Sequence, residues 1–364
     1  MDFPFFTRPW LSAEAYERRV AQALEAALAR AQAQPPWTFN LATDRWIILS
    51  DQHKGARNRA DEFIRCERAY NAALAYYFRL GHTLVVLGDA EELWKESPAA
   101  ILQHYAHTVQ LEAEYHRAGR YLRLWGNHDE EWSDPENVAW YLEPAYGAPL
   151  VVHESLLLNV CDGATALGTL FLTHGHQGAP PADQWARSAR LGVRYIWRTL
   201  QRLTGISANT PAKDWQLRER HNIALYNWAR AKSRLVLVAG HTHRPVFRSQ
   251  TYVEQVRGVL EELEARLQHA PDDQRLRKLV GDFAAELEWA RAQDDQAPGA
   301  EGEVMPMHTP CYFNTGCCSF RDGDISGLEL TDGQIRLVRW PDQAGRARPK
   351  ILAAAALRDV LAAC

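Results

Sequence analysis

Short apolar segments that end in clusters of polar residues recur along this chain of 364 residues, and this pattern constrains the fold more than any other feature. The clearest case is Leu235–Ala239, an apolar run that continues into Gly240, His241, Thr242 and His243. A run of this kind is typical of a buried strand in a parallel sheet. Glycine permits a sharp turn, and the two histidines that follow are close enough to reach one metal ion or two neighbouring ions.

Four earlier segments have the same form, an apolar candidate strand followed by Asp, Asn, Glu or His. They are 46–50 followed by Asp51 and His53, 83–87 by Asp89 and Glu92, 121–125 by Asn127, His128 and Asp129, and 169–173 by His174 and His176. Strands that alternate with helices predict an α/β fold. Because sites in such folds form outside the carboxyl ends of the strands, we expect the five clusters to meet at one place.

The remaining segments predict helical additions to this sheet-containing region. Ser12 is the expected N-cap of a helix that ends before Pro35 and Pro36. Two apolar stripes separated by a Pro-Asp-Asp turn predict an antiparallel helical hairpin. The predicted units are a helical N-terminal arm (1–45), the sheet-containing domain (46–250 and 306–340) with a lid-like helical insertion (181–234), the helical hairpin (251–305) and a C-terminal tail (341–364).

The composition disfavours several classes of protein. A net charge of -4 gives no overall reason to expect binding to nucleic acid or to a membrane surface. The six cysteines form no C-x-x-C pair, which indicates reduced thiols. We find neither the pattern of a signal peptide nor a run of about 18 apolar residues. We therefore expect a cytoplasmic protein without a transmembrane segment, for which peripheral membrane contact stays open.

The polar clusters together offer seven oxygen and nitrogen ligands for metal ions. They are Asp51, His53, Asp89, Asn127, His174, His241 and His243. Mixed ligands without thiolate suit divalent Mn, Fe, Co or Zn. Seven groups are too many for one ion and suit two ions about 3.5–4 Å apart that share a carboxylate. Burying these groups together without a cation would be costly, so the sequence predicts two divalent ions, with Mn as the first choice.

The same motifs resemble those of the calcineurin-like metallophosphoesterases. The matching motifs, in the order of the family, are Asp51-x-His53, Gly88-Asp89-x-x-Glu92, Gly126-Asn127-His128-Asp129, His174 and Gly240-His241-x-His243. The resemblance covers roughly residues 46–250 and the strands after 310. It implies a four-layer α-β-β-α sandwich with helical insertions, a dinuclear metal site and the activity of a phosphodiesterase or phosphatase.

The resemblance also implies a role for each matching residue. The implied ligands are Asp51, His53, Asp89 and His243 for one ion, and Asp89 as the bridge, Asn127, His174 and His241 for the other. His128 would be the catalytic histidine, and Asp129 would orient it. The implied nucleophile is a hydroxide that bridges the two ions.

Six other side chains are candidates for substrate contacts. Lys54 and Arg57 follow the first motif closely, although solvated loop charges are an equally good interpretation. His176 is either a contact to substrate or a plain loop histidine. The other three, Arg187, Arg190 and Arg194, recur every three or four residues and therefore share one face of a helix. That face can bind a phosphate or belong to an ordinary surface helix.

The substrate is the least constrained part of the interpretation. Trp94 and the helical insertion resemble the UDP-2,3-diacylglucosamine pyrophosphatase branch, but His128 stands where that branch commonly has Arg. We expect a small or lipid-linked phosphoester as substrate. The alternatives are a nuclease, which the acidic balance disfavours, and a non-catalytic scaffold, which the complete set of motifs disfavours. The hairpin 251–305 either mediates a homodimer or packs on its own domain.

Overall fold

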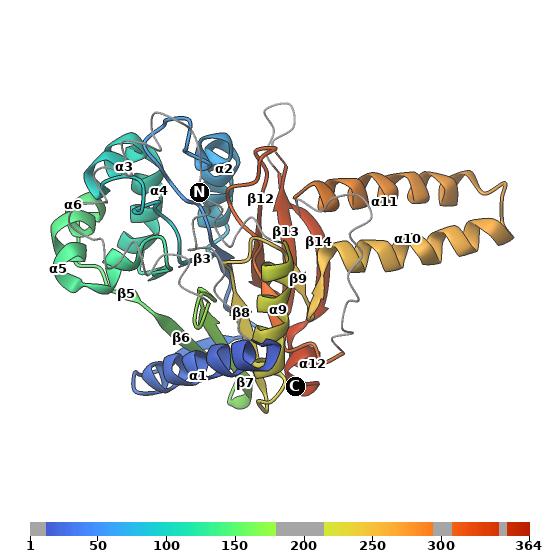
Figure 1. Cartoon of the computed structure of the whole chain (residues 1–364), viewed down its shortest axis with the longest axis horizontal. Helices are drawn as coiled ribbons and strands as arrows, with labels where there is room; N and C mark the ends of the chain where they lie inside the picture. Colours follow the sequence, from blue (N-terminus) through green and yellow to red (C-terminus); the bar gives the residue numbers. More distant parts are fainter. Residues whose placement is uncertain (1–11, 180–214, 294–307, 342–347) are drawn as a thin grey trace, which may run out of the picture.

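The computed structural model describes residues 12–179, 215–293, 308–341 and 348–364 (Figure 1). Within these residues the chain forms two seven-stranded sheets. The first sheet has the order β14-β13-β12-β2-β3-β4-β5, and the second has the order β1-β6-β7-β8-β11-β9-β10. Both sheets mix parallel strands with antiparallel ones, as expected when βαβ units and hairpins build the same sheet.

The first sheet carries the first three predicted motifs. Its strands are β2 (Trp46–Leu49), β3 (Thr83–Leu87), β4 (Tyr121–Leu124), β5 (Val152–His153), β12 (Ile325–Thr331), β13 (Gln334–Trp340) and β14 (Lys350–Ala356). Strands β2 to β5 run parallel to one another, whereas β12, β13 and β14 pair antiparallel. The parallel strands place their carboxyl ends at one edge, where the first three motifs begin.

The second sheet carries the two remaining motifs. Its strands are β1 (Trp37–Asn40), β6 (Ser155–Asp162), β7 (Thr165–Thr173), β8 (Leu235–Ala239), β9 (Val246–Phe247), β10 (Gln250–Thr251) and β11 (Tyr312–Asn314). Strands β6 and β7 form a hairpin and pair antiparallel. Strand β7 is parallel to β8, so the fourth and fifth motifs leave the same edge of this sheet.

Helices cover the outer faces of both sheets. Among the described residues, the α-helices of four residues or more are α1 (Ala13–Gln32), α2 (Glu67–Arg79), α3 (Pro98–His104), α4 (Ala106–Arg117), α6 (Glu143–Tyr146), α9 (Trp215–Ala229), α10 (Tyr252–His269), α11 (Gln274–Gln293) and α12 (Leu357–Ala362). Helices α2 and α4 lie on the first sheet, and α1 and α9 lie on the second (Figure 1). Ser12 caps α1 as expected, because its hydroxyl accepts a hydrogen bond from Ala15 N.

Three apolar cores hold these layers together. Strand β2 shows the principle, since Ile48 faces the core between the sheets while Ile47 and Leu49 face α2 and α4. The third core joins the second sheet to α1 and α9 through residues such as Val20 and Leu225. Alternate residues of a strand point to opposite faces, so the completely apolar β2 is buried on both sides. The predicted α/β fold with an α-β-β-α order of layers is confirmed.

Two parts of the chain differ from their expected structure. The C-terminal tail contains β14 and α12, and the N-terminal arm contains β1, which pairs with β6. The alanines that end β14 favour a helix by intrinsic propensity, and pairing with β13 overrides that preference.

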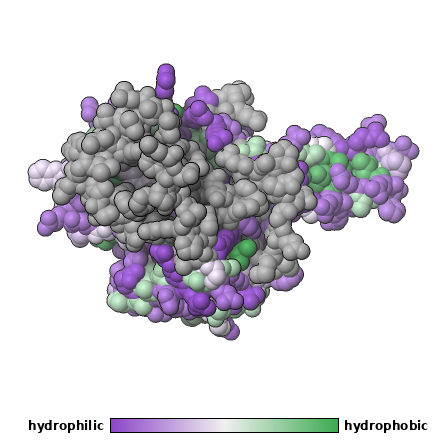
Figure 2. All heavy atoms as spheres, viewed as in Figure 1, coloured by the Kyte–Doolittle hydropathy of each residue, from purple (hydrophilic) through white to green (hydrophobic). Residues whose placement is uncertain are grey.

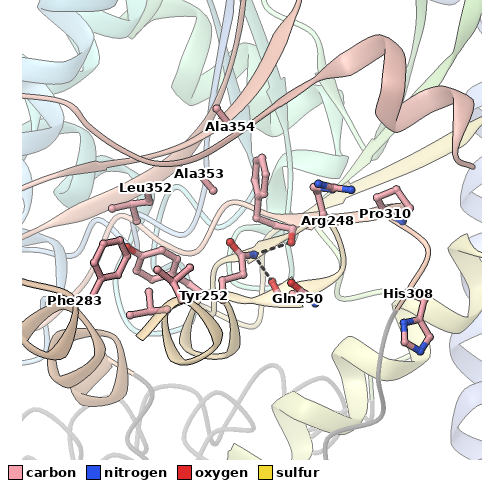
Figure 3. Close-up of a pocket in the computed structure, with 13 residues that line it drawn as sticks. Arg248, Gln250, Tyr252, Phe283, His308, Pro310, Leu352, Ala353 and Ala354 are labelled. Carbon is pink, nitrogen blue, oxygen red and sulfur yellow. Dashed lines mark hydrogen bonds between the residues drawn. The ribbon is translucent and has the colours of Figure 1, made fainter. Parts of the chain in front are cut away.

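Helices α10 and α11 form the predicted hairpin, which projects from the body of the protein (Figure 1). Figure 2 shows apolar side chains exposed along this projection between polar ones. Its root packs into the core between the sheets through Val256, Leu260 and Leu287. A groove of about 580 Å³ lies at the root, beside β9, β10 and β14 (Figure 3). A homodimer through the hairpin stays a prediction.

Across the described ranges, no helix combines the length and the apolar character that a membrane span requires.

Candidate metal centre

Loops from both sheets bring six of the predicted ligands together, and His128 lies among them. Three of these loops follow β2, β3 and β4 of the first sheet, and two follow β7 and β8 of the second. Within the described part of the chain, three groups of potential ligand atoms each lie within 4.8 Å of one another. The groups are Asp51, His53 and His243; His53, Asp89 and His128; and Asp89, His174 and His241. The site therefore spans the junction of the two sheets.

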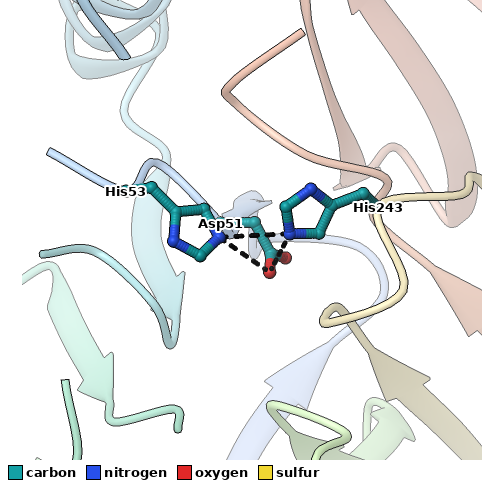
Figure 4. Close-up of side chains that lie close together, drawn as sticks. All are labelled: Asp51, His53 and His243. Atoms are coloured by element: carbon teal, nitrogen blue, oxygen red, sulfur yellow. Dashed lines mark hydrogen bonds and ion pairs between the residues drawn. The ribbon is translucent and has the colours of Figure 1, made fainter. Parts of the chain in front are cut away.

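The first group is shown in Figure 4. His243 Nε2 lies 3.2 Å from Asp51 Oδ1, and His53 Nε2 lies 3.8 Å from the same oxygen. The two Nε2 atoms are 3.1 Å apart. Two imidazole nitrogens and one carboxylate oxygen thus converge on one point, which is the arrangement of a metal-binding triad.

Asp89 joins the first half of the site to the second. Its Oδ2 lies 3.1 Å from His174 Nε2 and 3.9 Å from His53 Nε2. His174 Nδ1 lies 2.8 Å from the carbonyl oxygen of Leu87, to which it donates its hydrogen. That bond leaves Nε2 as the nitrogen of His174 that could bind a metal ion. Asp89 belongs to two of the three groups, which is what a bridging carboxylate requires.

Asn127 and three glycines show how closely the loops are packed around the ligands. The side-chain Oδ1 of Asn127 is buried and has no hydrogen-bond partner among the described residues. A Cβ at Gly88 would lie 2.7 Å from His174 Nδ1, and one at Gly240 would lie 2.6 Å from Asp51 Oδ2. At Gly126 it would overlap Asp89 Oδ1. An orphaned amide oxygen in such a cradle fits a cation, because unpaired buried acceptors are rare.

The backbone of the ligand loops is left-handed at five ligand positions. The φ angles are 55° at Asp51, 51° at His53, 52° at Asp89, 67° at His241 and 57° at His243. Residues other than glycine seldom adopt this conformation, and each instance costs about 1–3 kcal/mol. Such strain persists only where the surrounding structure imposes it, and it clusters at functional sites.

The charges of the site compensate one another only in part. Burial opposes ionisation of Asp51, but His243 and His174 outweigh burial and hold the pKa of Asp51 well below its usual range. Burial likewise lowers the pKa of His174, yet Asp89 and Asp51 raise that pKa to about 9. His241 has a lowered pKa because of burial and the neighbouring His174. The carboxylates thus require nearby positive charge, which two divalent ions would provide.

Glu92 orients His128, and this corrects the role expected for Asp129. His128 Nδ1 lies 3.0 Å from Glu92 Oε1. The carboxylate of Asp129 instead accepts backbone N–H groups from Gly126 at 2.6 Å and from Ala90 at 2.8 Å. Asp129 follows His128 directly and is turned toward the loops, so it fixes the backbone of two motifs instead of the imidazole.

Trp94 is a second neighbour of His128 that the sequence did not single out for this role. Its ring stacks on the imidazole with centroids 3.6 Å apart and an angle of 29° between the planes. His53 packs edge-on against His128 at 4.6 Å. The only signal in the sequence is that Trp94 stands two residues after Glu92.

Two of the candidate substrate contacts, Lys54 and Arg57, already have carboxylate partners in the structure. Lys54 is completely buried, with its ammonium 3.0 Å from Glu112 and 3.2 Å from Glu91, so it is not available to a substrate. Arg57 makes a bidentate pair with Glu67, and both bonds are 2.7 Å long.

Only His176 among these candidates lies beside the metal ligands in the described structure. Its ring centroid lies 5.5 Å from that of His174 and 5.3 Å from that of Trp125. Arg187, Arg190 and Arg194 lie outside the described residues.

Comparisons with known proteins add little to this geometry. No protein-family model matches the chain, and no curated protein matches it in sequence. One solved structure with a similar arrangement is that of Vacuolar Protein Sorting 29 from Cryptosporidium parvum. That similarity has a TM-score of 0.34 and 10% sequence identity, and it covers 86% of this chain and 98% of the other. The function is therefore argued from the residues of this chain.

Proposed function

We propose that this protein is a metal-dependent phosphoester hydrolase with two divalent ions, a member of the calcineurin-like metallophosphoesterases. The observation that carries the proposal is the position of Asp89 between two sets of ligands. One set contains Asp51, His53 and His243, and the other contains His174 and His241. The orphaned Oδ1 of Asn127 supplies one more donor. Oxygen and nitrogen donors of this kind suit Mn first, with Fe, Zn or Co as alternatives.

The metal ligands and His128 would have different roles in such a reaction. Two divalent ions held by these ligands would supply an activated water and positive charge for the phosphoryl oxygens. Because Glu92 holds Nδ1 of His128, Nε2 is the nitrogen left for the substrate. Burial lowers the pKa of His128, but Glu92 and Asp89 outweigh burial and raise it. His128 can therefore donate a proton from Nε2 to the leaving oxygen.

The proposal also extends to the class of substrate. We infer a small or lipid-linked phosphoester, and the lipid-linked diphosphate of the UDP-2,3-diacylglucosamine type is one case of it. His128 and His176 offer imidazole donors beside the ligands, whereas Lys54 and Arg57 already have carboxylate partners. The net charge of -4 supports a small substrate over nucleic acid.

Hydrolysis of three substrates by the Mn²⁺-reconstituted protein tests the proposal. They are bis-p-nitrophenyl phosphate, p-nitrophenyl phosphate and a UDP-linked diphosphate. We expect turnover that depends on the metal and that falls by about 10²–10⁴-fold in His128→Gln. His269→Gln, an exposed histidine on the hairpin, is the matched control and keeps full activity. A protein that hydrolyses none of the three with Mn, Fe, Co or Zn would contradict the proposal.

A further inference from the structure

Helix α9 contacts both loops that carry histidine ligands from the second sheet. Its neighbouring residues His221 and Asn222 are buried, with exposed fractions of 3% and 0%. His221 bonds to Gly175, and Asn222 bonds to Thr242. Gly175 stands between two histidines of the fourth motif, and Thr242 stands between His241 and His243. One turn of one helix thus holds the middle residue of both His-x-His stretches.

The hydrogen bonds of His221 define which nitrogen donates. Its Nε2 lies 2.6 Å from the carbonyl oxygen of Gly175, and its Nδ1 lies 2.7 Å from the hydroxyl oxygen of Tyr16. A carbonyl oxygen can only accept, so Nε2 carries the hydrogen. A neutral ring then accepts from the Tyr16 hydroxyl at Nδ1. The ring of His221 also lies 5.4 Å from the ring of His241.

The bonds of Asn222 fix the fifth motif in the same way. Its Oδ1 accepts from the hydroxyl of Thr242 at 3.1 Å and from the hydroxyl of Tyr312 at 2.8 Å. Asn314 completes the arrangement by donating to the carbonyl oxygen of Gly240 at 2.6 Å. Every residue in this network is fully or almost fully buried, which makes its bonds stronger than exposed ones.

Helix α1 braces the same region from outside. Besides the bond from Tyr16, its backbone lies against the loop that follows the fourth motif. A Cβ at Gly178 would lie 2.5 Å from the Cα of Val20, so only glycine permits this approach. Arg19 also donates to the carbonyl oxygen of Ala179 at 3.4 Å. The N-terminal arm is therefore connected to the ligand loops by packing and by hydrogen bonds.

We propose that α1 and α9 form a positioning clamp for the metal ligands of the second sheet. Tyr16, His221 and Asn222 fix Gly175 and Thr242, and these in turn fix the directions of His174, His241 and His243. The inference rests on the proposed function, because it assumes that these histidines bind metal. Groups that orient ligands are worth about 10–100-fold in metal affinity, and the same range applies to this clamp.

Titration of the metal-free protein with Mn²⁺ by calorimetry tests the clamp without any measurement of activity. Tyr16→Phe removes one hydroxyl that lies on α1 and touches no ligand. Its matched control is Tyr115→Phe, which removes a buried hydroxyl bonded to the carbonyl oxygen of Leu74 on the opposite side of the protein. We expect Tyr16→Phe to weaken the binding of Mn²⁺ by about tenfold, whereas Tyr115→Phe leaves it unchanged.

A second pair of variants tests the step from His221 to the loop. His221→Phe replaces the imidazole with another ring and removes both hydrogen bonds. His82→Phe makes the same substitution at a buried histidine away from the ligands, whose ring nitrogens have no hydrogen-bond partner among the described residues, so it controls for the loss of a buried imidazole alone. Thermal midpoints of all four variants separate loss of stability from loss of metal. Weaker binding in Tyr16→Phe and His221→Phe, beyond that of the controls, supports the clamp.

Two other outcomes would overturn the inference in distinguishable ways. If the unmodified protein binds Mn²⁺ and both clamp variants bind it equally well, the clamp is wrong and the proposed function stands. If the unmodified protein binds no divalent metal, the proposed function fails and the clamp fails with it. The absorption spectrum of the Co²⁺-loaded protein is a further check, because a displaced histidine changes the ligand field.

Discussion

The ligand loops and the helical hairpin are held in place by opposite means. The loops have buried charges, strained backbone and almost no regular structure, and parts of both sheets and of four outer helices surround them. The hairpin of α10 and α11 has exposed charges and regular backbone, and within the described part of the chain only its root packs against the body of the protein. The geometry of the loops is thus imposed by the fold, whereas that of the hairpin is mostly its own.

The ion pairs of two lysines, one in each region, illustrate this difference. Behind the ligand loops, Lys54 lies between Glu91 and Glu112 with no exposed side-chain area. On the hairpin, Lys278 and Asp282 form a pair one helical turn apart, with 76% and 58% of their side chains exposed. Exposed pairs contribute little to stability, while removing one partner of a buried pair leaves an uncompensated charge. The same chemistry should therefore have different consequences in the two regions.

The largest expected difference comes from neutralising one carboxylate in each region. Glu112→Gln leaves the buried Lys54 with one carboxylate partner, and it removes an acceptor charge that the hydroxyl of Tyr146 also contacts at 2.5 Å. We expect the free energy of unfolding to fall by about 3 kcal/mol or more. Asp282→Asn should change it by less than about 0.5 kcal/mol. Urea denaturation monitored by tryptophan fluorescence measures both values.

Equal changes in the free energy of unfolding would contradict the contrast between the two regions, because the buried pair would then contribute no more to stability than the exposed one. The matched design excludes a general effect of charge, since each variant loses one negative charge. Measuring Mn²⁺ binding of the folded Glu112→Gln protein adds a second readout. Lys54 follows the ligand His53 directly, so a displaced Lys54 should also weaken metal binding.

Adding one methyl group in each region should change the free energy of unfolding by a smaller amount, and the two changes should have opposite signs. At Gly126 the new Cβ would overlap Asp89 Oδ1 and lie 2.7 Å from His174 Cδ2. At Gly281, inside α11, it would meet no atom within 4 Å. Gly126→Ala should destabilise the protein by about 1–3 kcal/mol and weaken metal binding. Gly281→Ala should stabilise the hairpin by roughly 0.5–1 kcal/mol, because alanine restricts the unfolded chain.

Calorimetric melting of the two glycine variants, with and without Mn²⁺, checks these signs. Tolerance of Gly126→Ala with normal metal affinity would show that the loop can move away from Asp89. The loops would then be less constrained than the packing of their glycines indicates. A destabilised Gly281→Ala would show instead that this side of the hairpin is covered by a partner, as the predicted dimer requires.

The hairpin could be predicted from the sequence because its signals are local. Apolar residues recur at helical spacing, and the turn residues at 270–273 separate the two stripes. The fold class followed from a pattern of the same kind, short apolar strands that alternate with helices. Strand β14 was missed because its alanines carry no strand signal, and only pairing with β13 makes them a strand.

The candidate metal ligands could be predicted as a set because each one follows a strand, but their neighbours could not. The orienting role of Glu92 and the stacking of Trp94 depend on how two loops turn toward His128. His221 lies in a helix, more than 40 residues after the fourth motif, and nothing around it marks a role at the site. Contacts between distant segments of this kind are a property of the fold and leave no local signal.

A third comparison separates the pH response of the scaffold from that of the site. His82 is buried at the start of β3, at the opposite end from Asp89. Burial, followed by the charge of Arg45, lowers the pKa of His82 to about 4, against a smaller opposing effect of Asp332. The unfolded chain then binds a proton below about pH 6.5 that the folded protein does not bind. The stability that the neutral His82 contributes is complete above this pH and is lost as the pH decreases toward 4.

The expected loss is roughly 2 kcal/mol between pH 6.5 and pH 5, at about 1.4 kcal/mol for each pH unit. Urea denaturation of the metal-free protein at both values measures it, and His82→Phe should remove this part of the slope. His269→Phe, at an exposed histidine of the hairpin, should leave the slope unchanged. If His82→Phe retains the full slope, the pH response arises from other histidines whose pKa burial lowers, such as His241 in the fifth motif and His221 beside it. The strained site would then also limit the acid stability of the whole fold.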